Sequence, residues 1–169
     1  MRALSLWQPW ASFVDAGLKT VETRSWGTDY RGEVAIHAAH RRPRLEEGEA
    51  ILRAAGPNLG LRVLDVMDRP PALGAVVAVA RISACFRVLS AADCGHRLWV
   101  AAAATPGGAS VSPVEAVLGD LSPGRFAWLL ADIRPLREPH PLRGRQGLWT
   151  LSAEEDRAIR ALASPRGGT

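Results

Sequence analysis

GLKTVETR, residues 17–24, is the stretch in which we place the candidate site. It holds Lys19, the only lysine of the chain, whereas the other 20 of the 21 basic residues are arginine. Lysine offers a compact point charge with three rotatable donors, while arginine is a planar fork. We therefore expect position 19 to need what arginine cannot supply. The alternative is an ordinary exposed lysine, because single charges are usually solvated.

The residues on either side of Lys19 predict a short helix, a turn and a strand. Apolar residues recur at helical spacing from Pro9 onward, and Gly17 suits a left-handed cap at the end of that helix. The residues from 20 to 25 favour a strand, on which Glu22 and Arg24 share one face. On a regular strand the side chain of Lys19 would point to the opposite face, because 19 is an odd position and 22 and 24 are even. Lys19 can therefore join Glu22 and Arg24 only from the turn that precedes the strand.

The rest of the sequence predicts strands that alternate with short helices. We expect further strands at residues 3–7, 33–38, 74–88, 124–136 and 148–151. We expect helices at residues 45–55, ended by Gly56-Pro57, and after a capping box formed by Ser152 and Glu155. Residues 90–95 predict a turn, residues 101–113 a surface insertion and residues 134–147 an arginine-rich loop. Five or six strands with short peripheral helices predict an α+β fold, a small mixed β-barrel.

Length and composition predict one folded domain, residues 1–163, with a flexible tail at residues 164–169. Of the 169 residues, 47% are hydrophobic and 22% are charged, which is ordinary for a globular protein. The net charge of +4 is compatible with phosphate partners but does not demand them.

Cys85 and Cys94 are too few for a disulfide framework, and no charged-then-apolar leader precedes the first motif. The longest apolar run, residues 72–80, is far shorter than a membrane span. We expect a cytoplasmic protein without a membrane partner. His40, His96 and His140 are isolated and lack metal-ligand spacing, so we expect no metal and no cofactor.

The motif G-x-K-x-x-E-x-R is present in full at residues 17–24, and four further patches accompany it. Together they make the chain resemble the ASCH family, small proteins of the PUA-like β-barrel class, over roughly residues 3–151. The patches are LSLWQPWA at 4–11, YRG with IHAA at 30–39, GRFAW at 124–128 and GRQGLW at 144–149.

The resemblance implies a PUA-like barrel with a cleft lined by Lys19, Glu22 and Arg24. The family is generally regarded as binding RNA or nucleotides. Some small members that are similar in the lysine-containing turn are amidohydrolases that remove acyl groups from N4-acylated cytidine, using the lysine, a threonine nucleophile and a later glutamate. Here Glu22 stands where that threonine would be, while Thr20 and Thr23 are out of register, which shifts the weight toward recognition.

The chemistry of the three motif residues suits a nucleotide. Arg24 or Lys19 pairs with a phosphate, and Glu22 accepts a hydrogen bond from an exocyclic amine such as that of cytosine. The alternative is a structural ion pair between Glu22 and Arg24 on one strand face, and both can hold at once.

Aromatic side chains are numerous, and single-stranded nucleic acids use such rings as stacking platforms. We expect Trp7 and Trp10 to belong to the core. Trp26 follows the motif in a turn and is the preferred stacking ring, and Tyr30 is a second ligand-binding candidate.

Later residues supply further candidates. His37 lies in an apolar run, where a satisfied core histidine is the commoner role than a site residue. Gln146 is a candidate reader of a base edge. The arginines of the late loop either follow a phosphate backbone or form a solvated surface; they are Arg134, Arg137, Arg143 and Arg145.

Three functional hypotheses follow. The first is a module that binds RNA, single-stranded nucleic acid or a nucleoside around Lys19, Glu22 and Arg24. The second is an amidohydrolase on acylated cytidine or cytosine, in which Lys19 is the base and Glu22 positions water or the leaving amine. The third is a protein-interaction domain. The sequence leaves the oligomeric state open.

Overall fold

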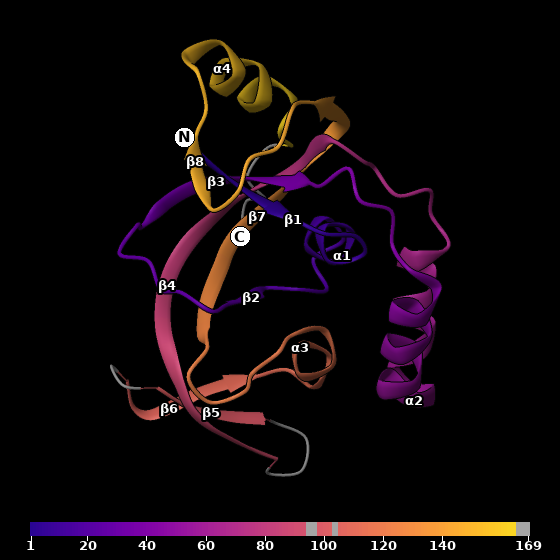
Figure 1. Cartoon of the computed structure of the whole chain (residues 1–169), viewed down its shortest axis with the longest axis vertical. Coiled ribbons are helices and arrows are strands. Elements are labelled where there is room, and N and C mark those ends of the chain that lie inside the picture. Colours follow the sequence, from indigo (N-terminus) through magenta and orange to yellow (C-terminus); the bar gives the residue numbers. More distant parts are fainter. Residues whose placement is uncertain (94–97, 103–104, 165–169) are drawn as a thin grey trace.

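Two long antiparallel strands, β4 (Ala75–Asp93) and β7 (Phe126–Pro141), run side by side through the molecule and organise the sheet (Figure 1). They belong to a computed structural model that describes residues 1–93, 98–102 and 105–164. Cys94, His96 and residues 165–169 of the expected tail lie outside the described residues. Three register shifts interrupt the pairing of β4 with β7. Such bulges bend strands, which accounts for the arc that both strands follow in Figure 1.

The sheet has the strand order β2-β7-β4-β3-β1-β8. β1 and β3 pair in parallel, and the other neighbours on this path are antiparallel. A hairpin of β5 and β6 pairs with the far end of β4. The bounds are β1 (Arg2–Leu6), β2 (Val21–Arg24), β3 (Gly32–Ala38), β5 (Leu98–Ala102), β6 (Thr105–Val111) and β8 (Leu148–Thr150).

The expected α+β fold is confirmed: the main path of the sheet has six strands, and the β5–β6 hairpin adds two more within the described ranges. In the described ranges, the two end strands β2 and β8 do not pair with each other. The sheet is therefore strongly curved and open rather than a fully closed barrel.

One of the four helices in the described ranges is longer than expected. The helices are α1 (Trp10–Asp15), α2 (Leu45–Met67), α3 (Pro113–Leu118) and α4 (Ala153–Leu162). Gly56, with φ 60° and ψ −174°, kinks α2 instead of ending it. Pro57 is tolerated because it begins the second segment, where its missing N–H costs nothing. Among the described residues, no helix is long and apolar enough to cross a membrane.

Two segments expected to be irregular are strands. Residues 90–93 and the parts of 101–113 that the structure describes form the end of β4, the hairpin and the start of α3 instead of a turn and an insertion. Residues 134–141 belong to β7 instead of a loop, although they include three prolines. Prolines are compatible with strands at bulges, and Pro135 pairs with Ala78 between two of the register shifts.

The core lies on both faces of the sheet, as the alternation along β1 and β3 requires. Leu4 and Ile36 point into a cluster that also contains Trp128 and residues of α1. Ala3 and Ala35 point into the opposite cluster, which is closed by α4 through Ile159. The sheet is thus covered by α1 on one face and α4 on the other.

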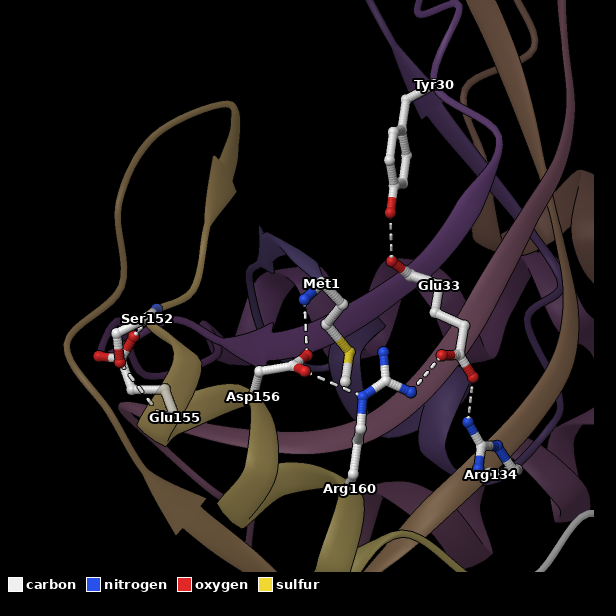
Figure 2. A network of polar contacts seen from close by, with 8 residues as sticks. All are labelled: Met1, Tyr30, Glu33, Arg134, Ser152, Glu155, Asp156 and Arg160. Carbon is white, nitrogen blue, oxygen red and sulfur yellow. Dashed lines mark hydrogen bonds and ion pairs between the residues drawn. The ribbon is translucent and has the colours of Figure 1, made fainter.

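A network of charges fastens α4 to the sheet (Figure 2). Glu33 of β3 pairs with Arg134 of β7 at 2.5 Å and with Arg160 of α4. Arg160 also reaches Asp156 at 3.0 Å, and Asp156 binds the amino group of Met1 at 2.6 Å. The expected capping box begins the same helix, since the backbone N–H of Glu155 donates to Ser152 Oγ at 3.1 Å.

Asp15, the last residue of α1, makes the stability of the fold depend on pH. Burial raises the pKa of its carboxyl to about 6, and nearby Arg69 offsets only part of that effect. Because the pKa in the folded state lies above that in the unfolded state, the native state binds more protons between about pH 4 and pH 6. The free energy of unfolding therefore falls as the pH rises through this range.

We predict that Asp15→Asn removes this slope. The variant should gain roughly 1–2 kcal/mol of stability at pH 7 relative to the unmodified chain, with no difference below pH 4. Urea unfolding at pH 4, 5, 6 and 7 measures the effect. A stability difference that does not change with pH would show that the carboxyl is ordinarily solvated.

Candidate functional site

Lys19 lies in the turn between α1 and β2, as the parity argument demands. Gly17 adopts φ 70° and ends the helix, and β2 begins only at Val21. The Lys19 side chain is 1% exposed, which rules out the alternative of a solvated lysine. Its Nζ donates to the carbonyls of Val21 and, at 3.3 Å, Leu118, and lies 3.6 Å from Glu22 Oε2. Three acceptors thus surround an ammonium that has three protons.

Glu22 continues the chain of charges to Arg24 on the same face of β2. Glu22 Oε1 lies 3.1 Å from Arg24 Nε, so the expected ion pair is present. Arg24 Nη2 then donates to the Ser5 carbonyl of β1 at 2.8 Å. The three motif residues therefore form one polar chain, with Lys19 at the buried end and Arg24 at the open end.

Helix α3 supplies two groups that the sequence analysis missed. Glu115 is buried, and its Oε1 accepts hydrogen bonds from the Thr20 N–H, from Thr20 Oγ1 at 2.7 Å and from the Val21 N–H at 3.1 Å. The Leu118 carbonyl accepts from Lys19 and, at 2.9 Å, from Trp10 Nε1. The sequence did carry a signal for this helix, because Ser112 and Glu115 have capping-box spacing around a proline at the first helical position.

The polar chain forms the wall of a cavity of about 300 Å³, here called the motif pocket. Trp10 and Leu118 line its apolar side, and Asp120 with Arg125 lie at its edge, 3.2 Å apart. Its lining residues are Ser5, Leu6, Trp7, Trp10, Lys19, Glu22, Thr23, Arg24, Leu118, Asp120 and Arg125.

A larger cavity of about 890 Å³, here called the arginine cavity, adjoins the motif pocket. The two share Ser5, Trp7 and Arg24. The arginine cavity has three arginines in its wall and no carboxylate among its lining residues. These residues are Ser5, Trp7, Arg24, His37, Ala39, His40, Gly74, Leu142, Arg143, Gly144, Arg145, Gln146 and Gly147.

His37 lies beneath the loop that carries two of these arginines. It is buried, and its Nε2 is 2.9 Å from the Leu142 carbonyl, so the neutral ring donates from Nε2. Burial lowers the pKa of His37, and the hydrogen bond to Leu142 opposes that shift only in part. Nδ1 has no hydrogen-bond partner in the part of the chain that the structure describes. A neutral imidazole at the cavity wall is therefore expected at pH 7.

Arg143 and Arg145 are exposed on that loop, with Gln146 beside them. Within the described ranges, neither arginine has a carboxylate partner, although the Arg145 guanidinium lies 5.5 Å from the centre of the Trp149 ring. The other two arginines considered for a phosphate contact fasten α4 instead. Arg134 pairs with Glu33, and Arg137 donates to the carbonyl of Ala161 at 2.5 Å.

The tryptophans lie differently from the expectation. Trp7 is not a core residue, since it is 57% exposed and lines both cavities. Trp26 lines neither cavity, and its ring meets Trp128 edge to face at 4.7 Å. Tyr30 also lies elsewhere, because its hydroxyl donates to the Glu33 carbonyl at 2.7 Å. The structure therefore groups Lys19, Glu22, Arg24, His37, Arg145 and Gln146 and leaves out Trp26 and Tyr30.

No group of three or more His, Cys, Asp or Glu side chains suited to a metal ion occurs among the described residues. The motif pocket offers carboxylates beside cations, and the arginine cavity offers cations, one side-chain amide and one neutral imidazole. This combination suits the recognition of an anion with a polar planar part.

We predict that Lys19→Met lowers the free energy of unfolding by about 3 kcal/mol, because it leaves the Glu22 carboxylate and two carbonyls without their buried cation. Urea denaturation measures the loss. Arg62→Met is the matched control, since it removes a positive charge from an exposed position on α2. A Lys19→Met variant as stable as this control would contradict the structural role of Lys19.

Comparisons with known proteins concern the family and the fold. The sequence model for the ASCH domain matches residues 4–116. Activating signal cointegrator 1 is 50% identical to this chain in the mouse protein and 48% identical in the human protein, each over 44 residues. These residues are 26% of this chain but 8% of either relative, so the chain matches only a small part of their length.

A solved structure is similar over nearly the whole chain. The crystal structure of ASCH from Zymomonas mobilis aligns with a TM-score of 0.54, covering 96% of this chain and 95% of that one, at 19% sequence identity. At this identity the likeness concerns the fold.

Proposed function

Because the chain belongs to the ASCH domain family, we propose that it binds RNA or a nucleotide in the cleft formed by the motif pocket and the arginine cavity. The observation that carries the proposal is the wall of the arginine cavity. Arg24, Arg143 and Arg145 line it without a carboxylate among the lining residues. Guanidinium groups suit phosphate because they donate two parallel hydrogen bonds.

In this proposal Lys19, Glu22 and Arg24 have different roles. Lys19 Nζ donates to two backbone carbonyls and pairs with Glu22, and the side chain is 1% exposed, so the main role of Lys19 in this proposal is to hold the turn and Glu22 in place. Glu22 faces the motif pocket and keeps unused lone pairs, which suit an exocyclic amine of a base. Arg24 spans both cavities and is placed to meet the phosphate.

The amidohydrolase alternative has less support. Lys19 Nζ donates to the carbonyls of Val21 and Leu118 and pairs with Glu22, and none of these partners is a hydroxyl that a base could deprotonate. Thr23, whose side chain lines the motif pocket, accepts a hydrogen bond on Oγ1 from the Asp120 N–H at 3.2 Å. Incubation with N4-acetylcytidine tests this alternative, and release of cytidine that requires Lys19 would restore it.

The protein-interaction alternative also has less support. The large exposed leucines of α2 are Leu45, Leu61 and Leu64. Leu45 begins the helix, and the other two lie on the far side of the kink at Gly56. With a rise of about 1.5 Å per residue, Leu45 and Leu61 are too far apart to form one patch.

We predict that Arg143→Ala and Arg145→Ala each weaken binding of a fluorescein-labelled single-stranded RNA of about ten nucleotides by roughly tenfold. Each should also reduce the dependence of log K on log salt by about 0.7 for every phosphate that the variant no longer neutralises. Fluorescence anisotropy at several salt concentrations measures both effects.

Arg62→Ala is the control, because it removes the same charge from the exposed surface of α2. Equal weakening by all three variants would mean a diffuse charge effect instead of a site. The proposal fails if the unmodified chain binds neither RNA, single-stranded DNA nor any nucleoside at low salt.

A further inference from the structure

Trp7 is largely exposed although the residues on either side of it are buried. It follows β1 directly, and its neighbours Leu6 and Gln8 are buried. A tryptophan side chain loses favourable free energy when its apolar surface faces water, so a ring that is 57% exposed at a cavity is a candidate for contact with a ligand.

One face of the Trp7 ring is already covered. The Arg41 guanidinium lies 4.2 Å from the ring centre, and Arg41 is itself held by Glu47 of α2 at 2.5 Å. This stack fixes the ring, because the guanidinium is bound on one side to a carboxylate and on the other to the indole. The remaining exposure of Trp7 must then come largely from its opposite face and its edges.

The exposed part of Trp7 and the unpaired arginines meet in one space. Trp7, Arg143 and Arg145 all line the arginine cavity, and its volume of about 890 Å³ lies within the usual range of small-ligand sites. A flat apolar surface beside clustered cations matches the two parts of a nucleotide, which are a planar base and an anionic phosphate.

We propose that the open face of Trp7 stacks one unpaired nucleobase while Arg143 and Arg145 hold the phosphate of the same nucleotide. The inference rests on the proposed function and narrows it to single-stranded nucleic acid or a free nucleotide. Inside a duplex both faces of each base are covered by neighbouring bases, so an internal paired base cannot stack on the ring.

Trp26 is the natural comparison, because it follows the motif directly and is also partly exposed. It is 37% exposed, but its ring packs against Trp128 outside both cavities. The two indoles therefore lie the opposite way round from the sequence expectation, with Trp7 at the cavities and Trp26 outside them.

The test compares Trp7→Leu, Trp7→Phe and Trp26→Phe in anisotropy titrations with the same labelled single-stranded RNA. We expect Trp7→Leu to weaken binding by about 5- to 100-fold, because the stacking of one base is removed. Trp7→Phe should stay within about threefold of the unmodified chain, since a phenyl ring still stacks. Trp26→Phe should bind as the unmodified chain does, and circular dichroism confirms that each variant is folded.

Competition by cytidine 5′-phosphate and ribose 5-phosphate isolates the base. The nucleotide should compete better than the sugar phosphate with the unmodified chain, and the two should compete equally with Trp7→Leu. A blunt RNA duplex should bind more weakly than the single strand.

The failures of the two proposals are distinguishable. If Trp7→Leu binds RNA like the unmodified chain while Arg143→Ala and Arg145→Ala still weaken binding, the stacking inference is wrong and the proposed function stands. Duplex RNA bound as tightly as the single strand would also overturn the stacking inference. Loss of binding in Trp26→Phe instead of Trp7→Leu would move the platform to Trp26. If the unmodified chain binds no RNA or nucleotide, both proposals fall.

Discussion

The buried ammonium of Lys19 is the interaction on which the site depends. A charge removed from water is tolerated only when it is paired and its donors are satisfied. Here the partners are the Val21 carbonyl, the Leu118 carbonyl and the Glu22 carboxylate. They come from β2 and α3, which are about a hundred residues apart in the chain, so one cation joins the two elements. A planar guanidinium does not fit three acceptors around one nitrogen, which explains a single lysine in an arginine-rich chain.

The residues linked to Lys19 are held rigidly by their partners, whereas the arginines of the late loop are exposed. Lys19 fixes Glu22, Glu22 fixes Arg24, and Arg24 is anchored to the Ser5 carbonyl of β1. Glu115 secures the turn from the other side through the N–H groups of Thr20 and Val21. The motif thus builds a rigid wall, while the exposed cations that face the arginine cavity come from the loop at residues 142–147. Neither part lines the whole cleft alone.

Local patterns predicted the elements whose geometry depends on a few neighbouring residues. The parity of Lys19, Glu22 and Arg24 is read from the strand period, and the final helix from its capping box. Local sequence patterns did not predict the features that depend on contacts between residues far apart in the chain. Glu115 reaches Thr20 across the fold, β7 accommodates its prolines where its register with β4 shifts, and Trp7 is apolar yet exposed because a cavity lies beside it. Composition could not reveal any of these three.

His37 positions the neighbouring loop as a neutral ring, although histidine is a residue that can carry a positive charge. Its ring donates to the Leu142 carbonyl and packs against Gly144, where a side-chain carbon would collide with the ring. A glycine is therefore required at position 144, and the loop lies directly on the imidazole. Protonation would place a second N–H on Nδ1, which has no partner within the described residues, and burial lowers the pKa accordingly. Because His37 is neutral, the positive charges on this side of the arginine cavity come from Arg143 and Arg145. The loop that carries both arginines is held in position by its contact with the uncharged His37 ring.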